Sequence, residues 1–307
     1  MTQYFVRLKG PDVQRGRIAG SVLAELLRLL VDGTRRAIRL RVEGRSTARG
    51  PAPAWLGEAS EFEVVALQEG SAVVVLEAEE LVDAAEALGQ LAMFAEVAPG
   101  ATGLALLRQS VDEAIQGREE SDHLDDGMLE AVEGWQRVLS GGITEAEFGN
   151  ATGKVTRITT DRLEHVARLR RQTPPPQRVR VAGWLDLIRH SDRMFTVKLE
   201  SGPTLRGVAE GVAAETLAGL FGRKAVVSGT AVFRPSGRVL RIEADHIEPA
   251  AEDFSLWSHE PRPVLSEGTP ANLKRPQGPR SGLGAIIGAW PGDESDETVA
   301  AALKELS

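Results

Sequence analysis

Apolar residues near the start of the chain recur with the two-residue period of a β-strand. Tyr4–Leu8 shows this alternation, and so do Phe62–Leu67 and Ala72–Glu77. Residues 69–71 (Glu-Gly-Ser) separate the last two segments, and a short connection with a glycine is typical of a β-hairpin. The pattern therefore predicts a small, largely antiparallel sheet.

Between the first strand and the hairpin we expect one helix and one further strand. Ser21 suits a helix N-cap and Gly33 suits a helix stop. The apolar residues between them fall on one helical face: Val22, Leu23, Leu26, Leu27 and Leu30. Residues 37–42 then alternate strictly between apolar and basic residues, which predicts a strand.

From Leu81 to about Gln172 the period of the apolar residues becomes helical. The expected helices cover residues 80–95, 102–116, 127–139 and 159–172. With the strands before them, they predict an α+β domain over residues 1–172. Residues 173–177 contain three consecutive prolines and form a stiff linker that ends this domain.

Residues 178–249 have the pattern of a second, mainly β unit. The expected elements are strands at Val179–Ile188, Phe195–Leu199 and Thr204–Val208, a helix at Ala213–Leu220, and strands at Ala225–Phe233 and Val239–Ala244. This element order resembles an OB-fold, a small five-stranded β-barrel. Alternation along the first strand places Val179, Val181, Leu185 and Leu187 inside, and Phe195 and Phe233 are also expected in the core.

The chain after residue 249 predicts a flexible linker followed by a short docking segment. Residues 250–289 are rich in proline and poor in apolar residues, so they cannot bury enough surface to fold alone. In residues 290–307, Ser295 is a good N-cap, and Val299, Leu303 and Leu306 form one apolar stripe. A helix this short is marginal in isolation, so it docks either on its own domains or on a partner; the long linker favours a partner.

Composition and charge limit the class of protein. Cysteine is absent, which excludes disulfides and thiolate sites, and the net charge of −8 argues against generic nucleic-acid binding by the whole chain. Residues 1–50 hold eleven Lys/Arg against four acids, a block that we interpret mainly as one side of internal ion pairs. Residues 1–20 lack the apolar core of a signal peptide, and no apolar run reaches membrane-spanning length, so we expect a cytoplasmic protein without a membrane partner.

Two glycine-rich segments and one acidic segment resemble ligand loops without completing them. Residues 149–154 and 282–288 both depart from the spacing of phosphate-binding loops. Residues 122–133 match four positions of a calcium loop, but Leu124 occupies a ligand position and cannot donate an oxygen. We therefore expect Asp125 or Asp126 to cap the following helix and His123 to be a solvent-exposed loop residue.

No motif of a catalytic nucleophile or of a zinc site is present, and the five histidines have no metal-ligand spacing. The sequence therefore predicts a binding protein without enzymatic activity, cofactor or metal. Whether it forms a homo-oligomer stays open.

The barrel offers one candidate binding surface, for nucleic acid. Arg180 and Trp184 are expected to point outward, and an exposed tryptophan beside an arginine suits base stacking. Arg234 and Arg238 fall in the loop between the last two strands, one of the binding loops of OB-folds. The alternatives are that residues 235–237 are an ordinary turn and that Trp184 packs on the barrel end or on the first domain.

The tail offers a second candidate surface. Residues 289–297 (Ala-Trp-Pro-Gly-Asp-Glu-Ser-Asp-Glu), followed by the apolar stripe, resemble the C-terminal tails of bacterial antitoxins encoded beside PIN-domain ribonuclease toxins. This resemblance implies that the tail wraps a toxin of that class and blocks its Mg²⁺-dependent site, with the acidic residues facing basic toxin residues. The implied partner-binding residues are Ile286, Ile287, Trp290, Asp293, Glu294, Asp296, Glu297, Val299, Leu303 and Leu306. We thus expect an antitoxin-like binding protein; the alternative is a nucleic-acid-binding accessory protein acting through the barrel.

Overall fold

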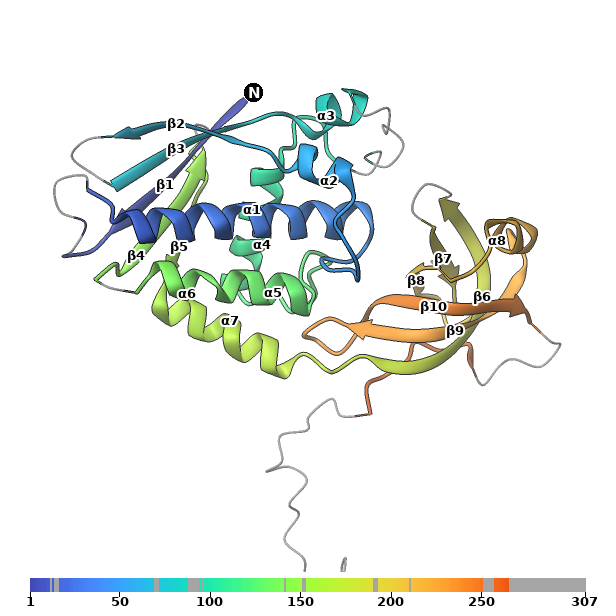
Figure 1. Cartoon of the computed structure of the whole chain (residues 1–307). Helices are drawn as coiled ribbons and strands as arrows, with labels where there is room; N and C mark the ends of the chain where they lie inside the picture. The colour runs from blue at the N-terminus through green and yellow to red at the C-terminus, as the bar shows by residue number, and fades with distance from the viewer. Residues whose placement is uncertain are drawn as a thin grey trace, which may run out of the picture. The chain divides into compact units, whose positions relative to one another are not determined.

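The computed structural model describes residues 1–11, 13, 17–68, 72–87, 94, 97–140, 142–150, 153–189, 193–209, 211–250 and 257–264. The chain divides into two units, Met1–Ser266 and Glu267–Ser307. All described residues belong to the first unit, which combines helices with two five-stranded sheets (Figure 1).

The first sheet is antiparallel throughout and has the order β2-β3-β1-β4-β5 (Figure 1). Its strands are β1 (Thr2–Lys9), β2 (Glu63–Gln68), β3 (Ala72–Ala78), β4 (Glu145–Asn150) and β5 (Val155–Thr159). The predicted strand near the N-terminus and the pairing of the next two strands are confirmed. The strands β4 and β5 were not predicted, because residues 145–159 were included in the helical stretch.

Ion pairs along β1 and β4 connect the basic N-terminal block to acidic residues of the same sheet. Lys9 Nζ lies 2.8 Å from Glu145 Oε1, and Arg7 Nη1 lies 3.1 Å from Glu147 Oε2. Hydrogen bonds from Lys9, with a smaller contribution from Arg7, lower the pKa of Glu147. For these residues the internal interpretation of the basic block is confirmed.

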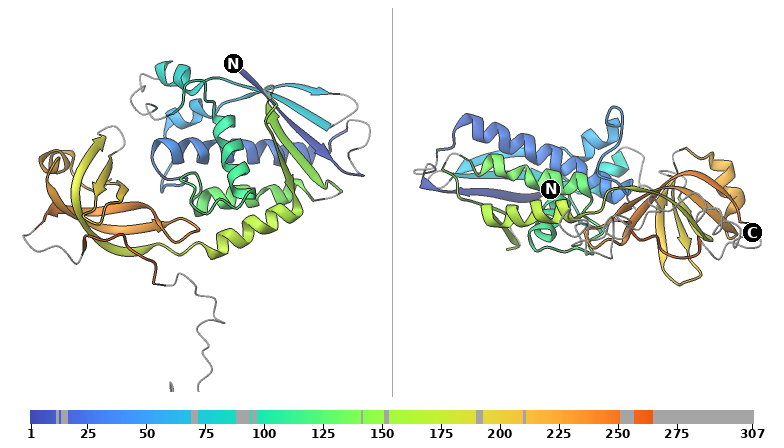
Figure 2. Two further views of the ribbon diagram at one scale, coloured as in Figure 1. Left: turned by 180° about the vertical axis from the view of Figure 1, so that it is seen from behind. Right: turned by 90° about the horizontal axis from the view of Figure 1, so that it is seen from below.

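Seven helices are described beside the first sheet. They are α1 (Gly20–Val42), α2 (Ala54–Ala59), α3 (Leu81–Ala87), α4 (Gly103–Ile115), α5 (Asp126–Glu133), α6 (Trp135–Val138) and α7 (Thr160–Gln172). The inward side chains of β1, among them Tyr4 and Val6, join a core with apolar residues of α1, α4, α5 and α7. Figures 1 and 2 show α4 crossing α1. The short helix α2 was not predicted.

The helix α1 continues through both features that predicted its end. Gly33 is buried inside it, and residues 37–42 form its last two turns rather than a strand. A Cβ atom at Gly33 would lie 2.8 Å from Leu107 Cδ1 of α4, so the glycine serves close helix packing and not termination. The helix starts one residue before Ser21, with Ala19 as its N-cap, so the predicted serine cap is wrong as well.

The second sheet has the order β10-β8-β7-β6-β9 and closes on itself through the antiparallel pairing of β9 with β10. Its elements are β6 (Gln177–Arg189), β7 (Met194–Lys198), β8 (Thr204–Val208), α8 (Ala214–Leu220), β9 (Lys224–Phe233) and β10 (Val239–Pro249). All six were predicted, within a few residues at their ends. We call the strands β6–β10 the closed sheet.

The core of the closed sheet follows the predicted alternation, with one exception. Val181, Leu185, Phe195 and Phe233 are buried, as expected. Leu187, predicted to point inward, is 44% exposed. The pairing of β6 with β7 shifts register between Leu185 and Leu187, and such a bulge turns the following side chain to the other face.

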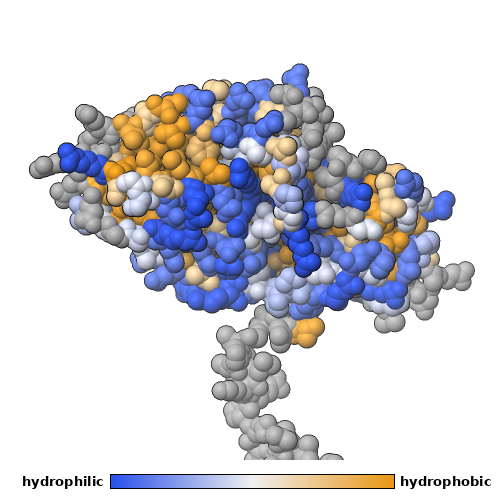
Figure 3. Space-filling model, in the orientation of Figure 1, coloured by the Kyte–Doolittle hydropathy of each residue, from blue (hydrophilic) through white to orange (hydrophobic). Residues whose placement is uncertain are grey.

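The surface of the first sheet carries an apolar area along its edge strand. Val64, Val65 and Leu67 of β2 are exposed. In the space-filling view, apolar side chains gather over the part of the molecule where β2 lies (Figure 3). Among the described residues no helix has both the length and the apolar character needed to cross a bilayer.

Candidate functional site

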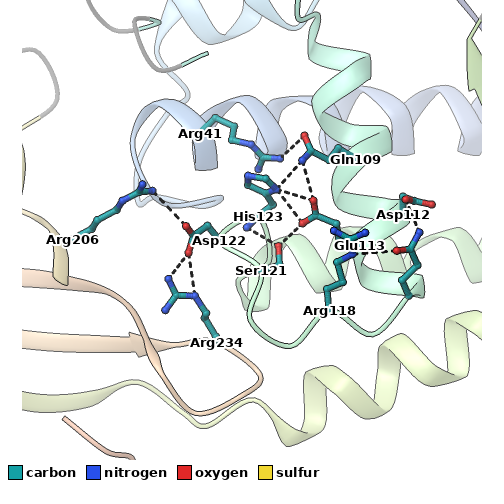
Figure 4. Close-up of polar contacts among 11 residues, drawn as sticks. Arg41, Gln109, Asp112, Glu113, Arg118, Ser121, Asp122, His123, Arg206 and Arg234 are labelled. Carbon is teal, nitrogen blue, oxygen red and sulfur yellow. Dashed lines mark hydrogen bonds and ion pairs between the residues drawn. The ribbon is translucent and has the colours of Figure 1, made fainter. Parts of the chain in front are cut away.

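A network of polar side chains lies where the α4–α5 connection, residues 116–125, meets the closed sheet (Figure 4). The connection starts at the end of α4 and ends at Asp125, which caps α5 by accepting a hydrogen bond from Met128 N at 2.9 Å. The predicted aspartate cap is confirmed. Leu124 is fully buried, which fits a core position beside that cap and not a ligand position of a calcium loop.

Glu113 and His123 form the centre of the network on the α4 side. His123 Nδ1 lies 3.0 Å from Glu113 Oε2, and a carboxylate only accepts, so Nδ1 carries the proton. Ser121 Oγ and Gln109 Nε2 also donate to Glu113. Burial alone would raise the pKa of Glu113, but these hydrogen bonds outweigh it and lower the pKa to about 2. His123 is thus half-buried and bonded, and the prediction of a solvent-exposed loop histidine is wrong.

Asp122 joins the network to the closed sheet. Arg234, in the loop between β9 and β10, donates to it through two nitrogens, and Arg206 of β8 lies 3.8 Å away (Figure 4). Burial would raise the pKa of Asp122, but the hydrogen bond and the charge of Arg234 lower it. The loop is also held by Ser236 N, which donates to Glu119 O.

A second junction contact lies deeper. Arg241 of β10 is buried and donates to Asp125 Oδ2 at 3.2 Å and to Glu243 Oε1 at 3.0 Å. The Asp125 carboxylate also accepts from Ser46 N, so it binds three donors: Met128 N, Arg241 and Ser46 N. Removal of Arg241 would leave the buried Asp125 carboxylate without its cation, and removal of Asp125 would leave the buried Arg241 with only the half-exposed Glu243 as counterion.

Arg41, in the last turn of α1, is the least satisfied cation of this region. Nη2 donates to Gln109 Oε1 at 3.4 Å, a long contact, and Nη1 is buried without a hydrogen-bond partner among the described residues. Burial lowers the pKa of Arg41 to about 10, against the opposing effect of the nearby charges of Glu113 and Asp122. Its position in the last turn is favourable for the helix dipole, but this does not supply an acceptor.

The network borders two hollows. A cavity of about 200 Å³, the junction cavity, is lined by Leu40, Arg41, Gly44, Asp122, His123, Met194, Arg206, Gly207, Val208, Leu240 and Arg241. A more open hollow of about 760 Å³, the closed-sheet groove, is lined by residues of β6, β7, β8 and the β9–β10 loop together with Glu120 and Asp122. The two hollows share the lining residues Asp122, Arg206 and Leu240 and are therefore neighbours.

The residues predicted for nucleic-acid binding all have partners within the chain. Arg180 is exposed but pairs with Glu248 and lies over the Trp257 ring. Trp184 is 45% exposed, as predicted, and Lys224 lies over its ring. Arg234 is held by Asp122, and Arg238 pairs with Glu260 at 3.4 Å and lies 3.9 Å from Glu120. Only Arg234 and Arg238 lie on the groove, so the structure does not bring the four residues into one surface.

The predicted partner-binding residues, from Ile286 to Leu306, lie outside the described residues, and so does the glycine-rich segment 282–288. In the part of the chain that is described, no group of three or more His, Cys, Asp or Glu side chains could hold a metal ion.

Comparison with protein-family models, with curated proteins and with solved structures finds no match for this chain. The function of the candidate site must therefore be inferred from the geometry of its own residues.

Glu113, Arg41 and Arg206 were not predicted as site residues. Glu113 stands in an amphipathic helix, where a charged residue is expected on the solvated face, and Arg41 was expected on the polar face of a strand at residues 37–42. The available signal was the dense polar run at residues 118–123, between a helix and an aspartate cap. That signal marks a loop but does not indicate which side chains from other elements reach it.

Proposed function

We propose that the protein is a non-enzymatic binding protein that neutralises a PIN-type nuclease through its C-terminal tail. The observation that carries this proposal is the residue pattern of 286–306, in which four acids at 293–297 lie between the apolar anchors Ile286, Ile287 and Trp290 and the stripe of Val299, Leu303 and Leu306. The composition of residues 250–289 supports it, because a proline-rich linker of that length has the reach to engage a second molecule.

The proposed mode of binding is that of a short amphipathic helix on a partner. Trp290 and the stripe of Val299, Leu303 and Leu306 would supply apolar anchors, which usually carry most of the binding energy. The acids between them would complement a basic groove and raise the association rate. This binding would block the nuclease by occupying its substrate site.

The test is co-expression with the protein encoded by the neighbouring gene, followed by co-purification. Deletion of residues 285–307 is expected to abolish the complex and to release nuclease activity, and Trp290→Ala is expected to weaken binding at least about tenfold. Trp184→Ala is the matched control, since it removes a half-exposed tryptophan of the closed sheet and should leave the complex intact. A complex that survives the deletion would rule out the proposal. Light scattering of the same samples measures homo-oligomer formation.

A second candidate function is binding of single-stranded nucleic acid by the closed sheet. We infer that this sheet is an OB-type barrel, because five strands with a helix after the third match the element order, and β8 pairs in parallel with β10. The closed-sheet groove favours binding there, since it runs over β7 and β8 and reaches the β9–β10 loop, which is where OB-folds bind oligonucleotides.

Electrostatics sets a condition on this second function. Arg234, Arg206 and Arg238 at the groove face Asp122, Glu120 and Glu260, so a phosphate chain must compete with carboxylates of the same chain. Replacement of acids should then strengthen binding. We expect Glu120→Gln with Asp122→Asn to raise the affinity for a single-stranded oligonucleotide several-fold in fluorescence anisotropy.

Two double variants test which surface of the closed sheet binds the oligonucleotide. Arg206→Gln with Arg238→Gln is expected to weaken oligonucleotide binding and to reduce its salt dependence. Arg180→Gln with Trp184→Ala tests the outward face of β6, where stacking is expected to contribute. Arg28→Gln, an exposed arginine of α1, is the charge-matched control. If both double variants bind like the wild type, this second function is excluded.

A further inference from the structure

The junction cavity contains more hydrogen-bond donors than its own acceptors satisfy. Arg41 and Arg206 line it with His123 and Arg241. A guanidinium has five N–H groups, and the side chain of Arg41 makes one long contact, to Gln109. Buried polar groups in native proteins are almost always satisfied, and an unsatisfied one frequently marks a bound ion or ligand.

The acids nearest to Arg41 do not supply the missing acceptor. Glu113 already accepts from His123, Ser121 and Gln109. Asp122 accepts from Arg234, and its second neighbour is Arg206. Neither carboxylate makes a hydrogen bond or ion pair with Arg41 that satisfies Nη1. The guanidinium is therefore desolvated without a direct counterion; Nη1 itself is closed to solvent, and an anion in the adjoining cavity would supply the missing countercharge.

We propose that the junction cavity binds a small oxyanion of the phosphate class, with Arg41 as its principal ligand. The cavity volume of about 200 Å³ equals that of roughly six or seven waters, which is sufficient for one tetrahedral oxyanion with a few waters. Arginine is the side chain best suited to such an ion, because its planar fork donates two parallel hydrogen bonds. Arg206, which also lines the cavity, would offer the second cation.

The charge of Asp122 does not oppose this ion on balance. Its carboxylate lines the cavity, but Arg234 holds it on the side of the β9–β10 loop, and Arg206 lies 3.8 Å away. Two of the cations that line the cavity, Arg41 and Arg241, come from α1 and β10. The helix α1 lies beside the first sheet, and β10 belongs to the closed sheet. An anion between them would stabilise the junction of α1 with the closed sheet.

Two kinds of ligand would present the same oxyanion to the cavity: a free phosphate ion and the phosphate group of a larger molecule. The cavity shares Asp122, Arg206 and Leu240 with the closed-sheet groove, so the groove lies beside a phosphate bound in the cavity and could receive the nucleoside of a larger ligand. The experiment therefore compares inorganic phosphate, adenosine monophosphate and adenosine. The proposal is independent of the function of the tail.

The experiment is thermal unfolding and calorimetric titration of the full chain. Phosphate is expected to raise the melting temperature relative to sodium chloride of equal ionic strength, because it binds only the folded protein. Tighter binding of adenosine monophosphate than of phosphate, without binding of adenosine, would identify a phosphate monoester as the ligand. Equal binding of both would identify the free ion.

Arg41→Met provides the decisive variant, since it replaces the guanidinium with an apolar chain that fits a buried site. It is expected to be at least as stable as the wild type without phosphate and to lose at least about tenfold in phosphate affinity. Arg41→Lys keeps the charge and should bind with intermediate affinity, and it serves as the reporter if Arg41→Met fails to fold. Arg28→Gln is the control and should respond to phosphate like the wild type.

Two results would overturn the proposal. One is a melting temperature that phosphate and chloride change equally, which would indicate only screening of charges. The other is phosphate binding of the same strength in the wild type and in the Arg41→Met and Arg41→Lys variants, which would place the ion elsewhere.

Discussion

At the scale of single residues, the polar network is organised by carboxylates that each serve several donors. Glu113 accepts from three side chains, and Asp125 accepts from Ser46 N, Met128 N and Arg241. Glu113 is stabilised as the anion, because each of its hydrogen bonds favours the charged form over the neutral one. The network therefore depends on pH.

Glu113→Gln tests that dependence. The folded-state pKa of Glu113, about 2, lies below the ordinary value of 4.5, so its ionisation stabilises the fold above pH 4.5. That contribution is lost as the pH falls from 4.5 toward 2. The variant is expected to lose about 2–3 kcal/mol of unfolding free energy at neutral pH and to show a flatter pH dependence between pH 2 and 4.5.

The measurement is urea unfolding at a series of pH values. Glu58→Gln, at an exposed carboxylate of α2, is the control and should follow the wild-type curve. A Glu113→Gln variant with wild-type stability at neutral pH and an unchanged acid limb would show that the hydrogen bonds to Glu113 contribute nothing to folding.

The residue-scale features that the sequence predicted are the local ones. The Asp125 cap depends on a backbone N–H three residues later, so its signal lies within one short segment. His123 was predicted wrongly because its partners, Glu113 and Gln109, stand on the preceding helix, and only the fold shows that this helix faces the loop. Arg41 and Arg206 reach the site from elements far along the chain, and no local pattern contains that information.

At the scale of elements, α1 shows how packing overrides a local stop signal. Gly33 costs a helix interior about 1 kcal/mol relative to alanine, which is why it suggested an end. Yet α1 and α4 meet at two glycines: a Cβ at Gly33 would approach Leu107, and a Cβ at Gly103 would lie 2.6 Å from Thr34 Cγ2. The close approach of the two helices requires both small residues.

Gly33→Val is therefore expected to destabilise the protein by about 1–3 kcal/mol, because the added carbons force Leu107 from its position. Gly219→Val is the matched control, since a Cβ at Gly219 of α8 meets nothing within 4 Å. The control should stay within about 0.5 kcal/mol of the wild type. Chemical unfolding of both variants checks the pair, and equal effects at the two glycines would contradict the packing argument.

Some strands were predicted and others were missed, because they differ in how many alternating positions the sequence shows. In β9, residues at every second position are apolar and buried, so the period is visible over ten residues. The strand β4 has only six residues, and two of them, Glu145 and Glu147, form ion pairs with Lys9 of β1. A short acidic strand of this kind has too few alternations to distinguish it from the helices on either side.

At the scale of the whole described unit, the closed sheet is fixed to the rest by buried charge as much as by apolar contact. Arg241 and Asp125 are both nearly fully buried, and Arg189 Nη2 donates to Val42 O at the end of α1 at 3.0 Å. Such pairs add modest net stability, but loss of one partner is expensive. The junction is therefore specific in its geometry and sensitive to single changes.

Asp125 and Arg241 are therefore expected to behave as one unit in a double-mutant cycle. Arg241→Met and Asp125→Asn should each cost about 3 kcal/mol, and the double variant should cost less than their sum by about 1–3 kcal/mol, because it leaves no unpaired buried charge. Scanning calorimetry should show one transition for the wild type and, for Arg241→Met, an earlier and separate transition of the closed sheet.

Glu243, the second partner of Arg241, is 44% exposed in its side chain, so Glu243→Gln is the control and should cost less than about 1 kcal/mol. Strictly additive costs would mean that the buried pair does not couple the closed sheet to the helices.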